Sequence, residues 1–179
     1  TALINYKTGS THFDEQIGNN KAEIDKVLDA LYKLTFTGEL VLDSVNMIAT
    51  SSPEGPERMN EHLAMQRAKE LKKYLLTRTD DSEGISLFQN RTIGEDWEKL
   101  TYLIRNDENI QNSSEILNAI TKIKNNDAKE IALRKFKEYA YIRKELYPKL
   151  RAVNFEFHLH RREMVKDTIH TTVIDSVYM

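Results

Sequence analysis

Two segments in the first half of the chain carry apolar residues at the spacing of an amphipathic helix. Over 20–34 the apolar positions follow an i, i+3, i+4, i+7 pattern: Ile24, Val27, Leu28, Leu31 and Leu34. Asn20 and Glu23 form a capping-box pattern at its start, so we expect the helix to begin there. Over 57–76, at about 100° per residue, one stripe holds Leu63, Ala64, Ala68, Leu71 and Leu75. Each segment is predicted to be a helix that packs one face on a core.

Four other stretches have the alternation or the β-branched content of strands: 2–7, 40–50, 85–93 and 153–160. The last has the clearest period of two, because its apolar residues alternate with polar ones: Val153, Phe155, Phe157 and Leu159. The second is apolar on both sides, with Leu40, Leu42 and Ile48 on one and Val41, Val45, Met47 and Ala49 on the other. Such a strand suits the middle of a sheet.

The interval 95–150 is predicted to be helical, and the polar stretch 77–84 is predicted to be an exposed loop. We expect one helix carrying Trp97, Leu100 and Ile104, a second from Asn112, and a third from Asp127 that ends before Pro148. The tail 161–179 is read as a C-terminal extension, either a hairpin or a linker.

These elements predict an α/β fold, more loosely α+β, in one domain of residues 1–160. A mixed sheet of about four strands, in β-α-β-α-β order, is covered on one face by helices 20–34 and 57–76. A helical insertion, 95–150, precedes the last strand. The expected core includes Leu28, Leu31, Leu71 and Phe157.

Two polar residues interrupt the apolar stripe of the second helix. Asn60 and Arg67 both fall on its buried side. Burying an amide and a guanidinium costs several kcal/mol unless both find partners. Either they hold the preceding loop, 51–56, or they line a site.

The same stretch resembles a known family. Gly55 in a tight loop after a strand, then Asn60, Leu63, Arg67 and Ala68, is similar to the OmpA-like (outer membrane protein A, C-terminal) peptidoglycan-associated domain, in its divergent Bacteroidota-type form. Residues 3–34 look like the family's first strand, loop and helix. Residues 85–97 look like its third strand with a Gly-Glu ending. The resemblance covers about half of the chain.

The resemblance implies a ligand site and also a departure from it. In the family, a loop Asp and the helix Arg hold the ammonium and the carboxylate of the diamino acid in the peptidoglycan stem peptide. Arg67 can hold a carboxylate, but the Asp position here is Ser52, which cannot neutralise an ammonium. Glu54 could substitute for it. Arg151 precedes the last strand, where the family often has an Arg pair.

The implied ligand-binding set is therefore Ser52, Glu54, Asn60, Arg67 and Arg151. It predicts a non-enzymatic domain of the periplasm or outer membrane that recognises peptidoglycan, or a related anion, weakly. The alternative is a protein–protein scaffold of an outer-membrane or surface-appendage assembly that has lost the ligand and binds other envelope proteins.

Composition and motifs exclude several other functions. The net charge of −2, with both signs interleaved, gives no field that favours nucleic acid. The absence of cysteine excludes disulfides, thiol catalysis and thiolate metal sites. No apolar run reaches the length of a transmembrane helix, and no catalytic or nucleotide-binding motif is present. We expect no enzyme activity, cofactor or metal.

Two further clusters each have a chemical and a simpler interpretation. Glu156, His158 and His160 share one strand face and could contribute to a Zn²⁺ site, but a solvated polar face is favoured. Residues 134–151 carry seven basic residues against two acidic ones, with three tyrosines interleaved. That segment could bind phosphate, anionic lipid headgroups or an acidic partner, or it could be a solvated helix face.

Overall fold

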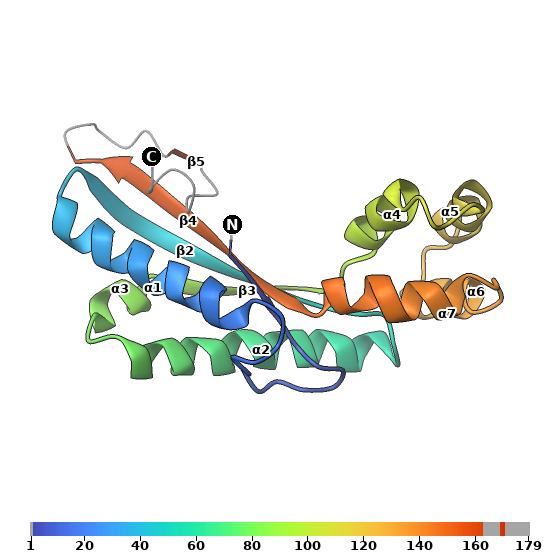
Figure 1. Cartoon of the computed structure of the whole chain (residues 1–179), viewed down its shortest axis with the longest axis horizontal. Helices are drawn as coiled ribbons and strands as arrows, with labels where there is room; N and C mark the ends of the chain where they lie inside the picture. The colour runs from blue at the N-terminus through green and yellow to red at the C-terminus, as the bar shows by residue number, and fades with distance from the viewer. Residues whose placement is uncertain (1, 163–168, 171–179) are drawn as a thin grey trace.

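The computed structural model describes residues 2–162 and 169–170, and it has the predicted α+β architecture (Figure 1). The sheet order is β1-β4-β2-β3, and β5 pairs with β4. The pairing of β2 with β3 is parallel, and the other pairings are antiparallel. The strands are β1 (Ala2–Asn5), β2 (Leu40–Ser51), β3 (Phe88–Glu95), β4 (Ala152–Arg161) and β5 (Ile169–His170).

One face of the sheet is covered by two long helices, α1 (Asn20–Thr37) and α2 (Glu57–Arg78) (Figure 1). The core lies between them and the sheet. Leu31, Leu71 and Phe157 are buried there as predicted, and Leu28 is half-buried against the same cluster. The aromatic ring of Phe88 packs edge-on against that of Phe157, with ring centroids 6.4 Å apart.

The first half of β2 differs from the prediction. Leu40 and Leu42 pack on the helix-side core together with Val45, whereas the alternation had placed them with Ile48. The pairing of β2 with β4 shifts register between Leu42 and Ser44. A one-residue irregularity exchanges the two faces of a strand, so both ends of β2 direct leucine or valine toward the helices.

The start of α1 covers the outer edge of β1. Asn20 is the first helical residue rather than the cap, and its amide makes two hydrogen bonds to the backbone of Asn5. The carboxylate of Glu23 accepts a hydrogen bond from the backbone N–H of Leu3. The predicted capping pair therefore satisfies an exposed strand edge instead of the helix end.

The stretch predicted as an exposed loop, 77–84, is partly helical. The helix α2 continues to Arg78, and a short helix, α3 (Ser82–Ser86), follows it. The side chain of Asp81 accepts a hydrogen bond from the Gly84 backbone N–H and caps α3, which buries Ile85. Consequently β3 begins at Phe88, three residues later than predicted.

The segment between β3 and β4 is helical and forms a second hydrophobic cluster at one end of the sheet (Figure 1). It contains α4 (Trp97–Asn106), α5 (Ser113–Thr121), α6 (Asn126–Leu133), α7 (Tyr139–Tyr141), a π-helical turn (Ile142–Leu146) and a 3₁₀ turn (Tyr147–Leu150). No helix in the described part of the chain is both long and apolar enough to cross a membrane.

The third predicted helix is interrupted after α6. The backbone tightens there through hydrogen bonds such as Phe136 N–H to Leu133 O, at 3.1 Å. The turn lets the hydroxyls of Tyr139 and Tyr147 both donate to the buried carboxylate of Glu130. Satisfying that carboxylate requires a bend that a continuous helix would not make.

The prediction for 161–179 falls mostly outside the described residues. Within it, β5 pairs antiparallel with His158 and Leu159 of β4.

Candidate functional site

A groove opens where the 52–56 loop meets the first turns of α2. Its volume is about 940 Å³. The start of α2 and the loop after β1 both contribute to its lining. Its lining includes Ser52, Glu54, Met59, Asn60, Leu63 and Arg151. Four of the five residues predicted to bind a ligand therefore line one cavity.

The charged end of this groove is formed by Glu54 and Arg151. The Arg151 guanidinium Nη1 lies 3.5 Å from Glu54 Oε1 and 3.5 Å from Ser52 Oγ. Its Nε donates to the backbone carbonyl of Tyr6 at 3.2 Å. Burial lowers the pKa of Arg151, and the neighbouring Glu54 acts against that shift. An anion and a cation therefore lie together in a groove whose lining also includes the charged side chains of Arg58 and Glu61.

Arg67, the fifth predicted residue, lies outside the groove wall. Its side chain is fully buried, and its guanidinium donates to three backbone carbonyls: Ser10 at 2.9 Å, Lys7 at 3.2 Å and Thr50 at 3.3 Å. It also lies over the Tyr6 ring, 5.1 Å from the centroid. Burial lowers its pKa to about 10, so it is charged at neutral pH. Arg67 joins the loop after β1 to the end of β2.

Within the described residues, no carboxylate lies within ion-pair distance of the Arg67 guanidinium. The Arg67 guanidinium is thus held by hydrogen bonds to carbonyl groups instead of by an ion pair. Carbonyl dipoles solvate the cation without neutralising it, so Arg67 contributes positive potential behind the groove.

Asn60 holds the start of α2 to the end of β3. Its side-chain amide donates to Glu95 Oε1 at 2.7 Å and approaches the Gly55 carbonyl at 3.4 Å. The other Glu95 oxygen accepts from Trp97 Nε1 at 2.8 Å. Burial raises the pKa of Glu95, and these two hydrogen bonds act against that shift. The sequence signal for Glu95 was the Gly-Glu ending of the third strand, but its partners were not foreseen.

A second cavity adjoins the groove on the side of the helical segment. Its volume is about 620 Å³, and it shares Thr8, Glu54 and Arg151 with the groove. Arg143 and Lys144 of the basic segment line it, together with Tyr139, Ala140 and Pro148. The basic residues are evident in the sequence, but their position beside Glu54 depends on the folded structure.

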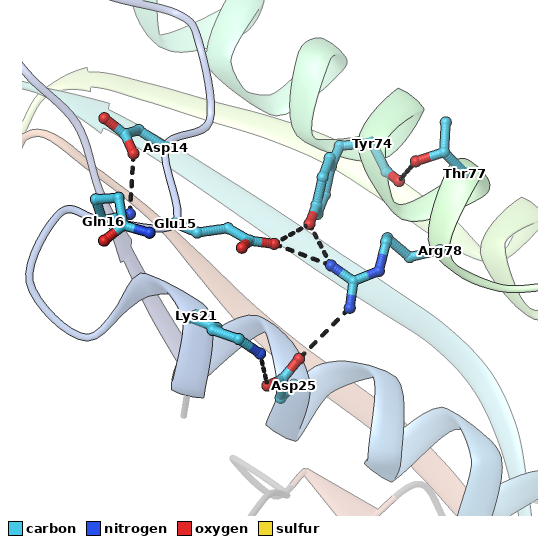
Figure 2. Close-up of polar contacts among 8 residues, drawn as sticks. All are labelled: Asp14, Glu15, Gln16, Lys21, Asp25, Tyr74, Thr77 and Arg78. Carbon is cyan, nitrogen blue, oxygen red and sulfur yellow. Dashed lines mark hydrogen bonds and ion pairs between the residues drawn. The ribbon is translucent and has the colours of Figure 1, made fainter.

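A polar cluster fixes the loop that leads into α1, as Figure 2 shows. Tyr74 and Arg78 of α2 both donate to the carboxylate of Glu15, at 2.7 and 3.0 Å. The Arg78 guanidinium also lies 3.8 Å from Asp25 on α1. The ring of Phe13 packs on that of Tyr74, with centroids 4.5 Å apart. This cluster anchors the same long loop whose first residues form the groove wall.

The histidines of β4 each have a local partner. His160 Nδ1 is 2.7 Å from Asp43, and His158 Nε2 is 2.9 Å from the amide of Asn46. In the part of the chain that the structure describes, no three metal-ligating side chains gather as a candidate metal centre.

In comparisons with known proteins, no protein-family model matches this chain, and a search of curated proteins finds no match.

Proposed function

We propose that this chain is a non-enzymatic, OmpA-like domain of the bacterial periplasm or outer membrane that binds the peptidoglycan stem peptide in the α2 groove. The observation that carries the proposal is the pair formed by Glu54 and Arg151 at the charged end of the groove. A diamino acid presents an ammonium and a carboxylate, and this pair offers one opposite charge to each. The β-α-β-α-β order and the residues of the resemblance support the same assignment.

The roles of the two arginines differ from those implied by the resemblance. Arg151 faces the groove and would receive the ligand carboxylate, while Arg67 holds the groove wall from behind. Glu54 would receive the ammonium in place of the missing loop Asp. Because Glu54 and Arg151 already contact each other, the ligand must compete with that ion pair, and we expect weak binding.

A protein–protein scaffold is the second candidate. It is favoured by the burial of Arg67, whose hydrogen bonds all serve the fold. In that case the groove charges hold loops together, and the partner is another envelope protein.

Co-sedimentation with purified insoluble peptidoglycan separates the two proposals. The variant Ser52→Asp restores the loop carboxylate that the resemblance implies, as an added partner for the ligand ammonium. One charged contact is worth about 1.5–3 kcal/mol, so binding should strengthen roughly tenfold or more. Arg151→Gln should remove binding. Arg105→Gln, an exposed arginine on α4, is the matched control and should bind like the wild type.

A stem-peptide site is contradicted if Ser52→Asp gains nothing and Arg151→Gln loses nothing while both variants stay folded. The scaffold proposal then becomes the better one.

A further inference from the structure

The cavity beside the helical segment has an excess of positive charge. Its lining includes three cationic side chains, Arg143, Lys144 and Arg151, and a single carboxylate, Glu54. Glu54 Oε1 lies 3.5 Å from Arg151 Nη1 and 3.8 Å from Arg143 Nε, so two guanidinium groups share one oxygen. Among the described residues, Lys144 makes no side-chain hydrogen bond or ion pair. The walls thus carry two more positive charges than negative ones.

This cavity continues the proposed binding groove. The two share Thr8, Glu54 and Arg151, so a ligand that reaches Arg151 from the groove also meets the second cavity. Arg143 is 61% exposed at its side chain and can turn from Glu54 toward a ligand. Tyr139 is fixed by its bond to Glu130, so it gives the cavity a rigid aromatic wall.

We infer that the helical segment adds an anion-binding subsite to the groove, which takes a second carboxylate of the same stem-peptide ligand. This inference rests on the proposed function. An excess of two cations around one carboxylate favours an anionic group, and a stem peptide carries further carboxylates beyond its diamino acid. Arg143 and Lys144 supply the charge, and Arg151 lies between the two subsites.

The test compares two soluble stem tetrapeptides by calorimetry. One has all carboxylates free, and the other is amidated at every carboxylate outside the diamino acid. The wild type should bind the free peptide about 3- to 10-fold more tightly, as expected for partly exposed charges. The double variant Arg143→Gln/Lys144→Gln should lose that preference. Lys135→Gln/Lys137→Gln removes the same charge from the same segment outside the cavity, and it should keep the preference.

A second probe separates failure of the subsite from failure of the proposed function. Succinate, a small dicarboxylate, is titrated while the Arg151 guanidinium resonance is followed by NMR. The subsite is supported, even when no peptide binds, if succinate shifts this resonance in the wild type and in Lys135→Gln/Lys137→Gln. The shift should be absent in Arg143→Gln/Lys144→Gln. Equal affinity for the two peptides, together with no succinate shift, overturns the subsite and leaves the stem-peptide proposal standing.

Discussion

At the scale of single residues, the most informative side chain is Arg67. A charged group on the apolar face of α2 predicts either a ligand contact or a structural partner. Its three hydrogen bonds go to carbonyls of two segments, the loop after β1 and the end of β2. A planar guanidinium can reach all three at once, which a lysine ammonium cannot do with the same geometry.

We expect Arg67→Ala to destabilise the fold before it affects any binding. Removing the guanidinium leaves three carbonyls without that donor and opens a cavity beside Tyr6, at a cost of about 2–5 kcal/mol. Denaturant unfolding measures the loss, and Arg67→Lys should recover only part of it. Lys69→Ala, exposed on the same helix, is the control and should change little.

This prediction is contradicted if Arg67→Ala unfolds at the same denaturant concentration as the wild type but no longer sediments with peptidoglycan. Arg67 would then act on the ligand directly, as the family resemblance implies.

At the scale of elements, the end of β3 sets the groove. The parallel pairing of β2 with β3 shifts register between Ala49 and Thr50, so Thr50 pairs with Gly94. Gly94 has a φ of 73°, and a Cβ there would lie 2.9 Å from Glu61 Cγ on α2. The shift turns the following residue, Glu95, toward Asn60 and so fastens the helix to the sheet.

Gly94→Ala should therefore cost more than an ordinary glycine replacement. The left-handed backbone conformation costs about 1 kcal/mol for a residue with a Cβ, and the contact with Glu61 adds to it. Gly38→Ala is the matched control, because Gly38 has a φ of 67° and open space around its Cβ position. Denaturant midpoints should rank Gly94→Ala below Gly38→Ala. Equal midpoints would mean that α2 moves away from β3 freely.

At the scale of the whole molecule, Glu95 connects two hydrophobic clusters. Asn60 belongs to the helix that covers the sheet, and Trp97 begins the helical segment with its separate cluster. A second contact joins the same parts, since Glu57 Oε1 accepts a hydrogen bond from the Asn126 amide at 2.6 Å. Both contacts lie next to the groove, so the shape of the groove depends on how the helical segment is attached to α2 and the sheet.

Burial of Glu95 predicts a pH dependence of stability. Burial, the largest cause, raises its pKa above the ordinary value of 4.5, and the nearby Glu57 and Asp127 charges add to the shift. The folded state then binds this proton more tightly than the unfolded state. The contribution of Glu95 to stability is thus present below its unfolded pKa and is lost as pH rises through the folded one.

The measurement is the free energy of unfolding of the wild type minus that of Glu95→Gln at several pH values. The difference should fall as pH rises above about 4.5 and then level off. Fluorescence of Trp97, the single tryptophan, reports the transition. A difference that grows with pH would show that the carboxylate is stabilised as an anion by Asn60 and Trp97.

The sequence alone determined the order of the main elements and many of the buried positions. Periodicity reports burial locally, because a helix or strand that packs one face repeats its apolar residues at a fixed spacing. The stripe over 57–76 thus identified Asn60 and Arg67 as buried, and the alternation over 153–160 identified β4. The resemblance also selected Ser52, Glu54 and Arg151, which line one groove.

Only the tertiary structure decided which cation faces the groove and where the strands shift register. Arg67 is partnered by carbonyls about 60 residues earlier in the chain, and no local pattern encodes so distant a contact. The irregularity near Asp43 depends on how β2 meets β4, so it is a property of the pair rather than of either strand. The cavity that unites Glu54 with Arg143 likewise exists only because the helical segment packs at the end of the sheet where the 52–56 loop lies.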